Sequence, residues 1–168
     1  MTIADLNSAD REAFVAAVGF AFENSPWVAE AAWERRPFAN RQALLESLLA
    51  VVAEAPHDRK IALIGAHPDL AGRIAREGRL SAASQEEQAA AGLDRLSSAE
   101  IARFDSLGAA YRKAFGFPFV ICAREHTKDS ILVVLAARAT HTRDEEFATA
   151  LDEIAKIARL RLEERIAE

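Results

Sequence analysis

Signals that begin helices recur along this chain and constrain its fold more than any other feature. A serine or threonine precedes a glutamate by three residues at three places: Ser84/Glu87, Ser97/Glu100 and Thr142/Glu145. In this pattern, the capping box, each of the two side chains bonds the backbone N–H of the other residue in the first helical turn. Ser25-Pro26 and Asn40 are two further N-terminal signals. The chain is therefore expected to be mostly helical.

Apolar spacing supports the same reading. Glycine occurs 7 times and proline 5 times in 168 residues, so few positions interrupt a helix. Two apolar stripes recur at helical spacing: Leu44, Leu45, Leu48, Leu49 and Val52, and then Ile101, Phe104, Leu107 and Tyr111. We expect the first of these helices to begin after Asn40 and the second to end near Gly116. The helix that opens at Ser25-Pro26 should end before Pro37.

Two apolar segments need separate treatment. Residues 117–122 contain Pro118, which cannot donate to a central sheet, so we expect an extended passage through the core. Residues 130–135 are ambiguous, because their β-branched residues favour a strand whereas Leu135 to Arg138 favour a helix. Few strand partners exist elsewhere, so we predict a helix there. The expected fold is all-α, a single multi-helix domain over residues 1–168 with one extended apolar segment at about 117–123.

Composition excludes several classes of function. The chain is 51% hydrophobic and 28% charged, as in ordinary globular proteins. Its net charge of −5 gives no basis for binding nucleic acid, and no apolar run approaches the roughly 20 residues that span a bilayer. The single Cys122 excludes an internal disulfide. With no signal-peptide pattern at the start and no Ser-Lys-Leu type ending, we expect a cytoplasmic protein.

His67 is the first candidate for chemistry. It precedes Pro68, whose ring disfavours the α conformation in the preceding residue, so a helix through residues 61–64 should end at His67. Imidazole is the side chain that ordinarily titrates near neutral pH. Glu87 and Gln88 are expected at the start of the next helix, and the three side chains together indicate a small acid–base site. The structural alternative is that His67 only ends a helix and that Glu87 only caps one.

The last helix carries a second candidate. Phe147, Leu151, Ile154 and Ala158 form its apolar stripe, and Arg161 falls within about 20° of Ile154 at the 100° advance per residue of a helix. An arginine on a buried stripe needs a partner, either an internal carboxylate or an anionic ligand. The negative charges of residues 144–146 are stabilised by the positive end of the helix dipole, and no further role is predicted for them.

These residues carry a family resemblance. The motifs are Gly65-x-His67-Pro68-x-Leu70, Ser84-x-x-Glu87-Gln88 with Ala91-Gly92-Leu93, Tyr111-x-x-x-Phe115-Gly116-Phe117-Pro118-Phe119, and Ile157-Ala158-x-Leu160-Arg161-Leu162. Near the start, Phe22-Glu23-x-Ser25-Pro26-Trp27 and Arg36-Pro37-Phe38 also match. In this order along nearly the whole chain, they resemble the family of 2-oxo-4-hydroxy-4-carboxy-5-ureidoimidazoline decarboxylases.

The resemblance implies a cofactor-free, all-α enzyme without a metal, usually a homodimer, that performs the last step from urate to S-allantoin. By this likeness His67 is the catalytic proton donor and Glu87 the essential carboxylate. The implied substrate-binding positions are Pro68, Ser84, Gln85, Glu86, Glu87, Gln88, Phe119, Val120, Ile121, Cys122, Ala123 and Arg161. The residues 119–123 are expected to bind the ligand through backbone groups.

Two positions depart from the family pattern: Gly108 and His141 stand where asparagine is usual. They put local turn geometry, or a contact to a binding residue, in question. Two other functions remain open. One is an enzyme with a metal site built from His67, Asp69, Glu86 and Glu87, although a second histidine at ligand spacing is lacking. The other is a helical ligand-binding or regulatory module that has lost catalysis.

Overall fold

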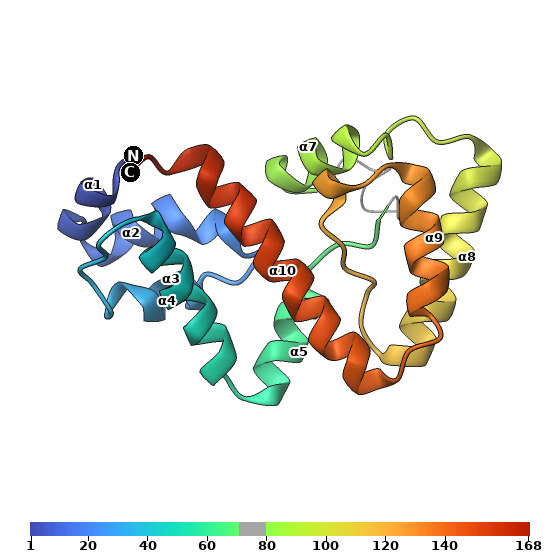
Figure 1. Ribbon diagram of the computed structural model, residues 1–168, viewed down its shortest axis with the longest axis horizontal. Helices are drawn as coiled ribbons and strands as arrows, with labels where there is room; N and C mark the ends of the chain where they lie inside the picture. Colours follow the sequence, from blue (N-terminus) through green and yellow to red (C-terminus); the bar gives the residue numbers. More distant parts are fainter. Residues whose placement is uncertain (71–79) are drawn as a thin grey trace. The chain divides into compact units, whose positions relative to one another are not determined.

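The computed structural model of the protein describes residues 1–70 and 80–168, and every helix or strand element in these ranges is a helix. This confirms the all-α fold class. The chain forms two compact units, one of residues 1–66 with 155–168 and the other of residues 67–154 (Figure 1). No helix within the described ranges has the length and apolar character needed to cross a membrane. The assignment of residues 1–168 to one domain stays a prediction.

The first unit contains the C-terminal part of the last helix, from residue 155, and the helices of residues 1–66. They are α1 (Ile3–Ser8), α2 (Arg11–Val18), the 3₁₀ helix η1 (Gly19–Ala21), α3 (Trp27–Trp33), α4 (Arg41–Glu54) and α5 (His57–Gly65). Helix α3 contacts both α2 and α4. The Asn40 side chain accepts from the N–H of Ala43 at 2.8 Å, so the predicted cap of α4 is confirmed. The N-cap of α3 is Pro26, so the predicted Ser25 cap is one residue too early.

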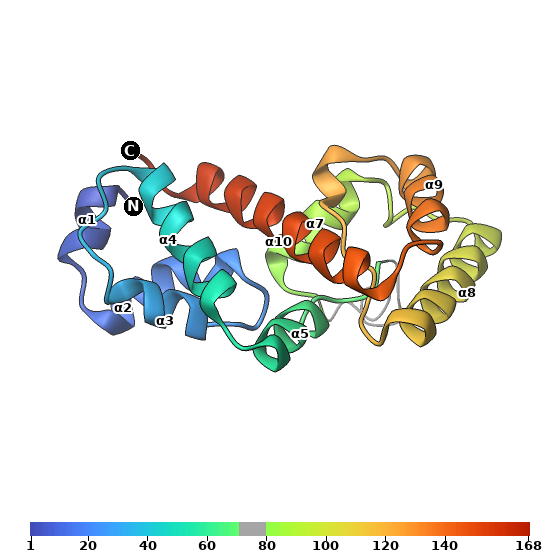
Figure 2. The ribbon, with the colours of Figure 1, turned by 60° about the horizontal axis from the view of Figure 1, so that its bottom comes forward.

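The two ends of the chain meet within this first unit. Thr2 and Ala167 form an isolated β-bridge, and the N–H of Ala167 donates to the carbonyl of Met1 at 2.9 Å. The N and C labels accordingly lie next to each other in both views (Figures 1 and 2). The C-terminal end of the last helix is therefore tied to the start of α1.

The second unit contains α7 (Ala82–Ala90), α8 (Ser98–Phe115), the 3₁₀ helix η2 (Ala123–Glu125), α9 (Lys128–Arg138) and the first half of α10 (Arg143–Arg165). Helices α8 and α9 contact each other and lie side by side in both views (Figures 1 and 2). The helix predicted for residues 130–135 is confirmed by α9.

Local signals at the start of α8 and α10 and at the end of α8 behave as the sequence predicts. The capping boxes at Ser97/Glu100 and Thr142/Glu145 are both formed. Helix α8 ends at Gly116, whose φ of 84° is the left-handed conformation that glycine accepts without strain. The chain from Phe117 to Cys122 is neither helix nor strand and is buried, which confirms the extended passage through the core.

Gly108 provides a test of local stability, because it lies inside α8 rather than at an end. A Cβ added there meets nothing within 4 Å. We expect Gly108→Ala to raise the free energy of unfolding by about 0.5–1 kcal/mol, since alanine loses less backbone freedom in a helix. Urea denaturation measures the change. Gly116→Ala is the matched control and should lower the stability, because its φ is 84°; a loss of stability in Gly108→Ala would contradict this account.

Candidate active site

His67 lies directly after a helix end. Helix α5 ends at Gly65 with Ala66 as its C-cap, and His67 and Pro68 follow, so the helix ends two residues before the predicted position at His67. The His67 side chain is buried, with the whole residue 6% exposed. Asp69, two residues on, accepts from Arg112 of α8 at 2.9 Å with both carboxylate oxygens. This ion pair, in which both side chains are nearly half exposed, links the segment after His67 to α8.

Helix α7 presents three polar side chains on one buried face. It begins at Ala82, and the Ser81 side chain caps it by accepting from the N–H of Ser84 at 3.2 Å. The predicted Ser84/Glu87 capping box is therefore wrong, because the helix starts one turn earlier and places both residues in its interior. Ser84, Glu87 and Gln88 are buried, in keeping with their i, i+3, i+4 spacing.

The same register separates the five predicted substrate-binding positions of α7 into two groups. Gln85 and Glu86 are exposed, whereas their three neighbours are buried. Adjacent residues on a helix point about 100° apart, so one ligand on the buried face is within reach of Ser84, Glu87 and Gln88 rather than of Gln85 and Glu86. This geometry therefore does not favour contacts between that ligand and the side chains of Gln85 and Glu86.

Two predicted binding segments lie next to each other in the second unit. Helix α7 packs against η2, which begins at Ala123, and the N–H of Lys128 donates to the carbonyl of Ala91 at 2.9 Å. Residues 119–123 are each at most 6% exposed. Within the two described ranges, no hydrogen bond involves the N–H or C=O of Ile121. A buried peptide group ordinarily has a partner, so these two groups are suited to a polar ligand.

A buried charge network stands behind this segment. Arg138 of α9 donates through Nε and Nη2 to Oε2 of Glu146 at 3.0 and 2.9 Å, and Glu146 is fully buried. The Tyr111 hydroxyl also donates to Glu146. Burial, and next the hydrogen bond to this carboxylate, raises the pKa of Tyr111 well above its usual value, so the phenol keeps its proton.

Glu146 was expected only to interact with the positive end of the last helix, and this prediction is corrected because the residue is fully buried. The residue does lie in the first turn of α10, but it points into the core. The signal that was available is its spacing, because Glu146 falls four and eight residues before the buried Ala150 and Ile154. Its partners Arg138 and Tyr111 come from other helices, and no local pattern identifies them.

Arg161 is buried, as its place on the apolar stripe predicts. The two partners left open by the sequence were an internal carboxylate and a ligand, and the first is present. Nη1 and Nη2 of Arg161 donate to Oε2 of Glu23 at 3.3 and 3.2 Å, and Nη1 also donates to the carbonyl of Phe20 at 3.0 Å. Arg161 belongs to the first compact unit and His67 to the second, so their joint role stays a prediction.

The two departures from the family pattern have different surroundings. Gly108 occupies the interior of α8 and has room for a side chain. His141 lies just before α10, with Nδ1 at 2.8 Å from Oε1 of Glu146. The second departure therefore contacts the buried network, and the first affects helix propensity.

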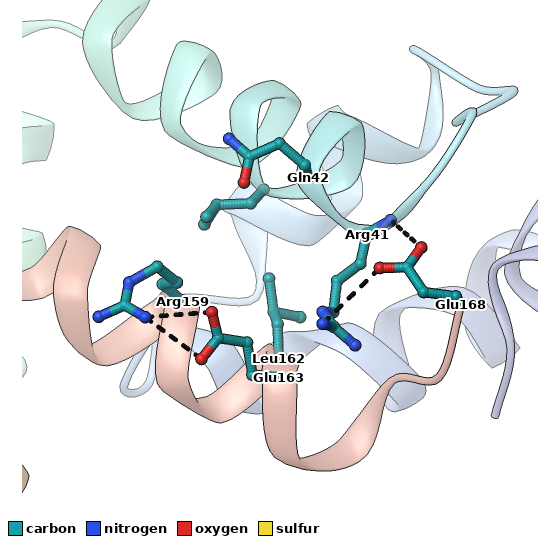
Figure 3. A pocket seen from close by; sticks show the side chains of 7 residues that line it. Arg41, Gln42, Arg159, Leu162, Glu163 and Glu168 are labelled. Atoms are coloured by element: carbon teal, nitrogen blue, oxygen red, sulfur yellow. Dashed lines mark hydrogen bonds and ion pairs between the residues drawn. The ribbon is translucent and has the colours of Figure 1, made fainter.

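The first unit contains a pocket that is lined mainly by charged residues. It is lined by Arg41, Gln42, Leu45, Arg159, Leu162, Glu163 and Glu168 (Figure 3). Arg159 pairs with Glu163 at 3.1 Å and Arg41 with Glu168 at 3.6 Å, so each arginine has a carboxylate partner. None of the predicted site residues lines it, and we do not assign it to the reaction.

The metal alternative finds no support in the geometry. The Asp69 carboxylate accepts hydrogen bonds from Arg112. On α7, Glu86 is exposed whereas Glu87 is buried. Across residues 1–70 and 80–168, no group of three or more histidine, cysteine or acidic side chains is arranged to hold a metal ion. The predicted ligand set is therefore not assembled.

Comparison with known proteins identifies the same family as the sequence motifs. The sequence profile described as OHCU decarboxylase matches residues 7–163. The 2-oxo-4-hydroxy-4-carboxy-5-ureidoimidazoline decarboxylase of Halalkalicoccus jeotgali is 43% identical, with 98% of this chain and 91% of the relative covered. The protein of the same name from Mus musculus is 38% identical, with 96% and 91% covered.

Solved structures agree with the fold. A crystal structure of (S)-allantoin synthase matches with a TM-score of 0.80 and 32% identity, over 99% of this chain and 54% of that chain. A crystal structure of OHCU decarboxylase in the presence of (S)-allantoin matches with a TM-score of 0.72 over 93% of this chain and 97% of that chain. Its identity of 20% supports the shared fold alone.

Proposed function

This chain belongs to the OHCU decarboxylase family, and we propose that it converts 2-oxo-4-hydroxy-4-carboxy-5-ureidoimidazoline to S-allantoin in urate degradation. The observation that carries this proposal is the buried polar face of α7, with Ser84, Glu87 and Gln88, packed against the 3₁₀ helix η2 that ends the extended segment. These groups belong to the same compact unit as His67. A small, amide-rich heterocycle needs this mixture of buried donors and acceptors.

The proposed reaction is a decarboxylation followed by protonation. The bond between the ring carbon and the carboxylate breaks, CO₂ leaves, and the electron pair is delocalised into the conjugated imine of the ring. The imine nitrogen takes up a proton, and a second proton is added on one face of the ring carbon that carried the imine. The hydroxyl proton is lost as the carbonyl forms on the carbon that carried the carboxylate. Because the substrate supplies its own electron sink, the step requires neither a pyridoxal-type cofactor nor a metal.

The protein's residues are assigned roles that fit this chemistry. His67 delivers the proton to carbon, since imidazole exchanges protons near neutral pH. Glu87 orients the imidazole or accepts from ring and ureido N–H groups. Gln88 and the backbone of Ile121 hydrogen-bond the amide-like edges of the substrate, and Pro68 lines the pocket beside His67.

The experiment generates the labile substrate from urate with the upstream enzymes and follows optically active allantoin by circular dichroism. The protein is expected to speed the formation of S-allantoin, because enzyme-directed protonation selects one face whereas unaided decay gives both enantiomers. Unchanged formation of racemic allantoin would overturn the proposal. Binding of (S)-allantoin without turnover would instead identify a ligand-binding module that has lost catalysis.

Arg161 matches the family's arginine in the terminal helix, and its role in substrate binding is tested by Arg161→Lys. Lysine keeps a charge near Glu23 but lacks the guanidinium fork, so KM should rise about tenfold if Arg161 binds the substrate carboxylate. Initial rates at varied substrate concentration measure KM. Glu23→Gln is the control for the ion pair alone. A lowered melting temperature with an unchanged KM in Arg161→Lys would mark the arginine as structural.

We also propose that the protein is a cytoplasmic homodimer, as the family resemblance implies. Sedimentation equilibrium of the purified protein tests the dimer, with a mass of twice 18.3 kDa as the expected result. A monomer at micromolar concentration would remove the dimer from the proposal without affecting the reaction.

A further inference from the structure

The extended segment is held by two side chains that the proposed reaction does not use. Nη1 of Arg138 donates to the carbonyl of Val120 at 2.8 Å, and the N–H of Cys122 donates to Oε2 of Glu153 at 2.7 Å. Arg138 also lies over the Phe119 ring, 4.4 Å from its centroid. Val120 and Cys122 are thus anchored on either side of Ile121.

The two anchors are themselves fixed. The guanidinium of Arg138 is paired with the fully buried Glu146, and Glu146 and Glu153 are seven residues apart on α10. Seven residues correspond to nearly two helical turns, so both carboxylates lie on one face of α10. Charge-assisted bonds to a planar guanidinium are strong and directional. One helix face therefore holds Cys122 directly and Val120 through Arg138.

Backbone groups alternate in direction along an extended chain, and this determines which groups of the segment point away from the two anchors. The backbone groups of successive extended residues point to opposite sides, so anchors at Val120 and Cys122 turn the N–H and C=O of Ile121 away from them. We infer that Arg138 and Glu153 are positioning residues that orient Ile121 so that its peptide groups hydrogen-bond the substrate. This inference rests on the proposed function. Neither residue touches the reacting atoms.

The test compares Glu153→Leu with Glu153→Gln and adds Arg138→Lys. Leucine removes the acceptor for Cys122, so KM should rise about tenfold with a smaller change in kcat, as expected when binding of the ground state and transition state is lost together. Glutamine keeps an acceptor oxygen and should stay within about threefold of wild type. Lysine retains the charge beside Glu146 but not the fork, so Arg138→Lys should resemble Glu153→Leu.

A second measurement does not depend on the variants. In the wild-type protein, added (S)-allantoin should shift the amide NMR resonance of Ile121 more than that of Cys122, whose N–H is held by Glu153. A larger shift at Cys122 overturns the inference even if both Glu153→Leu and Arg138→Lys fail to fold.

The other outcomes separate the two proposals. If wild type is active and Glu153→Leu and Arg138→Lys keep its KM, with or without a lower melting temperature, the positioning role is overturned and the proposed function stands. Equal losses in Glu153→Gln and Glu153→Leu also overturn it, because the acceptor would then be irrelevant. If wild type shows no turnover, the proposed function fails and this inference fails with it.

Discussion

His67→Ala is expected to reduce enzymatic formation of S-allantoin by about 10²–10⁴-fold, the usual contribution of a positioned general acid or base. Alanine removes the imidazole without adding volume to its buried position. Without proton delivery to one face of the ring, the allantoin that does form should be racemic. The variant is therefore expected to show two losses together, one in rate and one in optical activity.

The measurement follows the circular dichroism of allantoin from enzymatically generated substrate, at equal concentrations of wild type and variant. His57→Ala is a matched control, because His57 is an exposed histidine at the other end of α5. His67→Gln is a second variant, which keeps a polar side chain but cannot titrate near neutral pH. Far-UV circular dichroism and thermal melting confirm that each variant folds.

The contrary results are specific. A His67→Ala protein that still produces S-allantoin at the wild-type rate would remove the proton-donor role. If His67→Gln is active while His67→Ala is not, the residue acts through hydrogen bonding or packing rather than by proton transfer. Loss of activity in His57→Ala would show that the assay reports on folding rather than on the site.

The sequence predicts the helices well because their ends are set by local interactions. Asn40, Ser97 and Gly116 act through bonds or backbone angles within a few residues, and the structure has a helix end at each of them. The extended segment follows in the same way from Pro118. These features require no knowledge of the rest of the fold.

The start of α7 shows where local reasoning fails. Ser81 and Ser84 are both good N-caps, and only Ser84 has a glutamate three residues later, so the pattern favours the wrong serine. In the structure the earlier start places Ser84, Glu87 and Gln88 on a buried face. The packing of α7 against η2 is a tertiary contact, and it is absent from any window of local sequence. The resemblance assigns these residues to substrate binding, which stays a prediction, whereas their predicted place at the start of the helix is wrong.

The charge network around Glu146 illustrates the same limit at longer range. Arg138, Tyr111 and Glu146 come from three different helices, and each looks ordinary in its own segment. Spacing can indicate that a charged residue faces the core, as it does for Arg161, but it does not name the partner. The partner of Arg161, Glu23, lies 138 residues away in the sequence.

Glu146→Leu is expected to lower the free energy of unfolding by about 3–5 kcal/mol, the usual cost of removing one member of a buried ion pair. The variant leaves the guanidinium of Arg138 in the core without its carboxylate and takes the acceptor from the Tyr111 hydroxyl. Urea denaturation monitored by circular dichroism measures the change. Asp144→Ala, an exposed acidic position in the same first turn, should change stability by less than about 1 kcal/mol.

Adding Arg138→Met to Glu146→Leu tests the cause of this loss. The double variant no longer buries a lone charge, so it should be more stable than Glu146→Leu by about 1–4 kcal/mol, because apolar replacements of a buried pair are often tolerated. If the double variant is no more stable than Glu146→Leu, the desolvated charge is not the source of the loss. If the double variant regains stability while its KM stays above that of wild type, the ion pair contributes little to the stability of the fold. The rise in KM then comes from the loss of Arg138, which orients Val120.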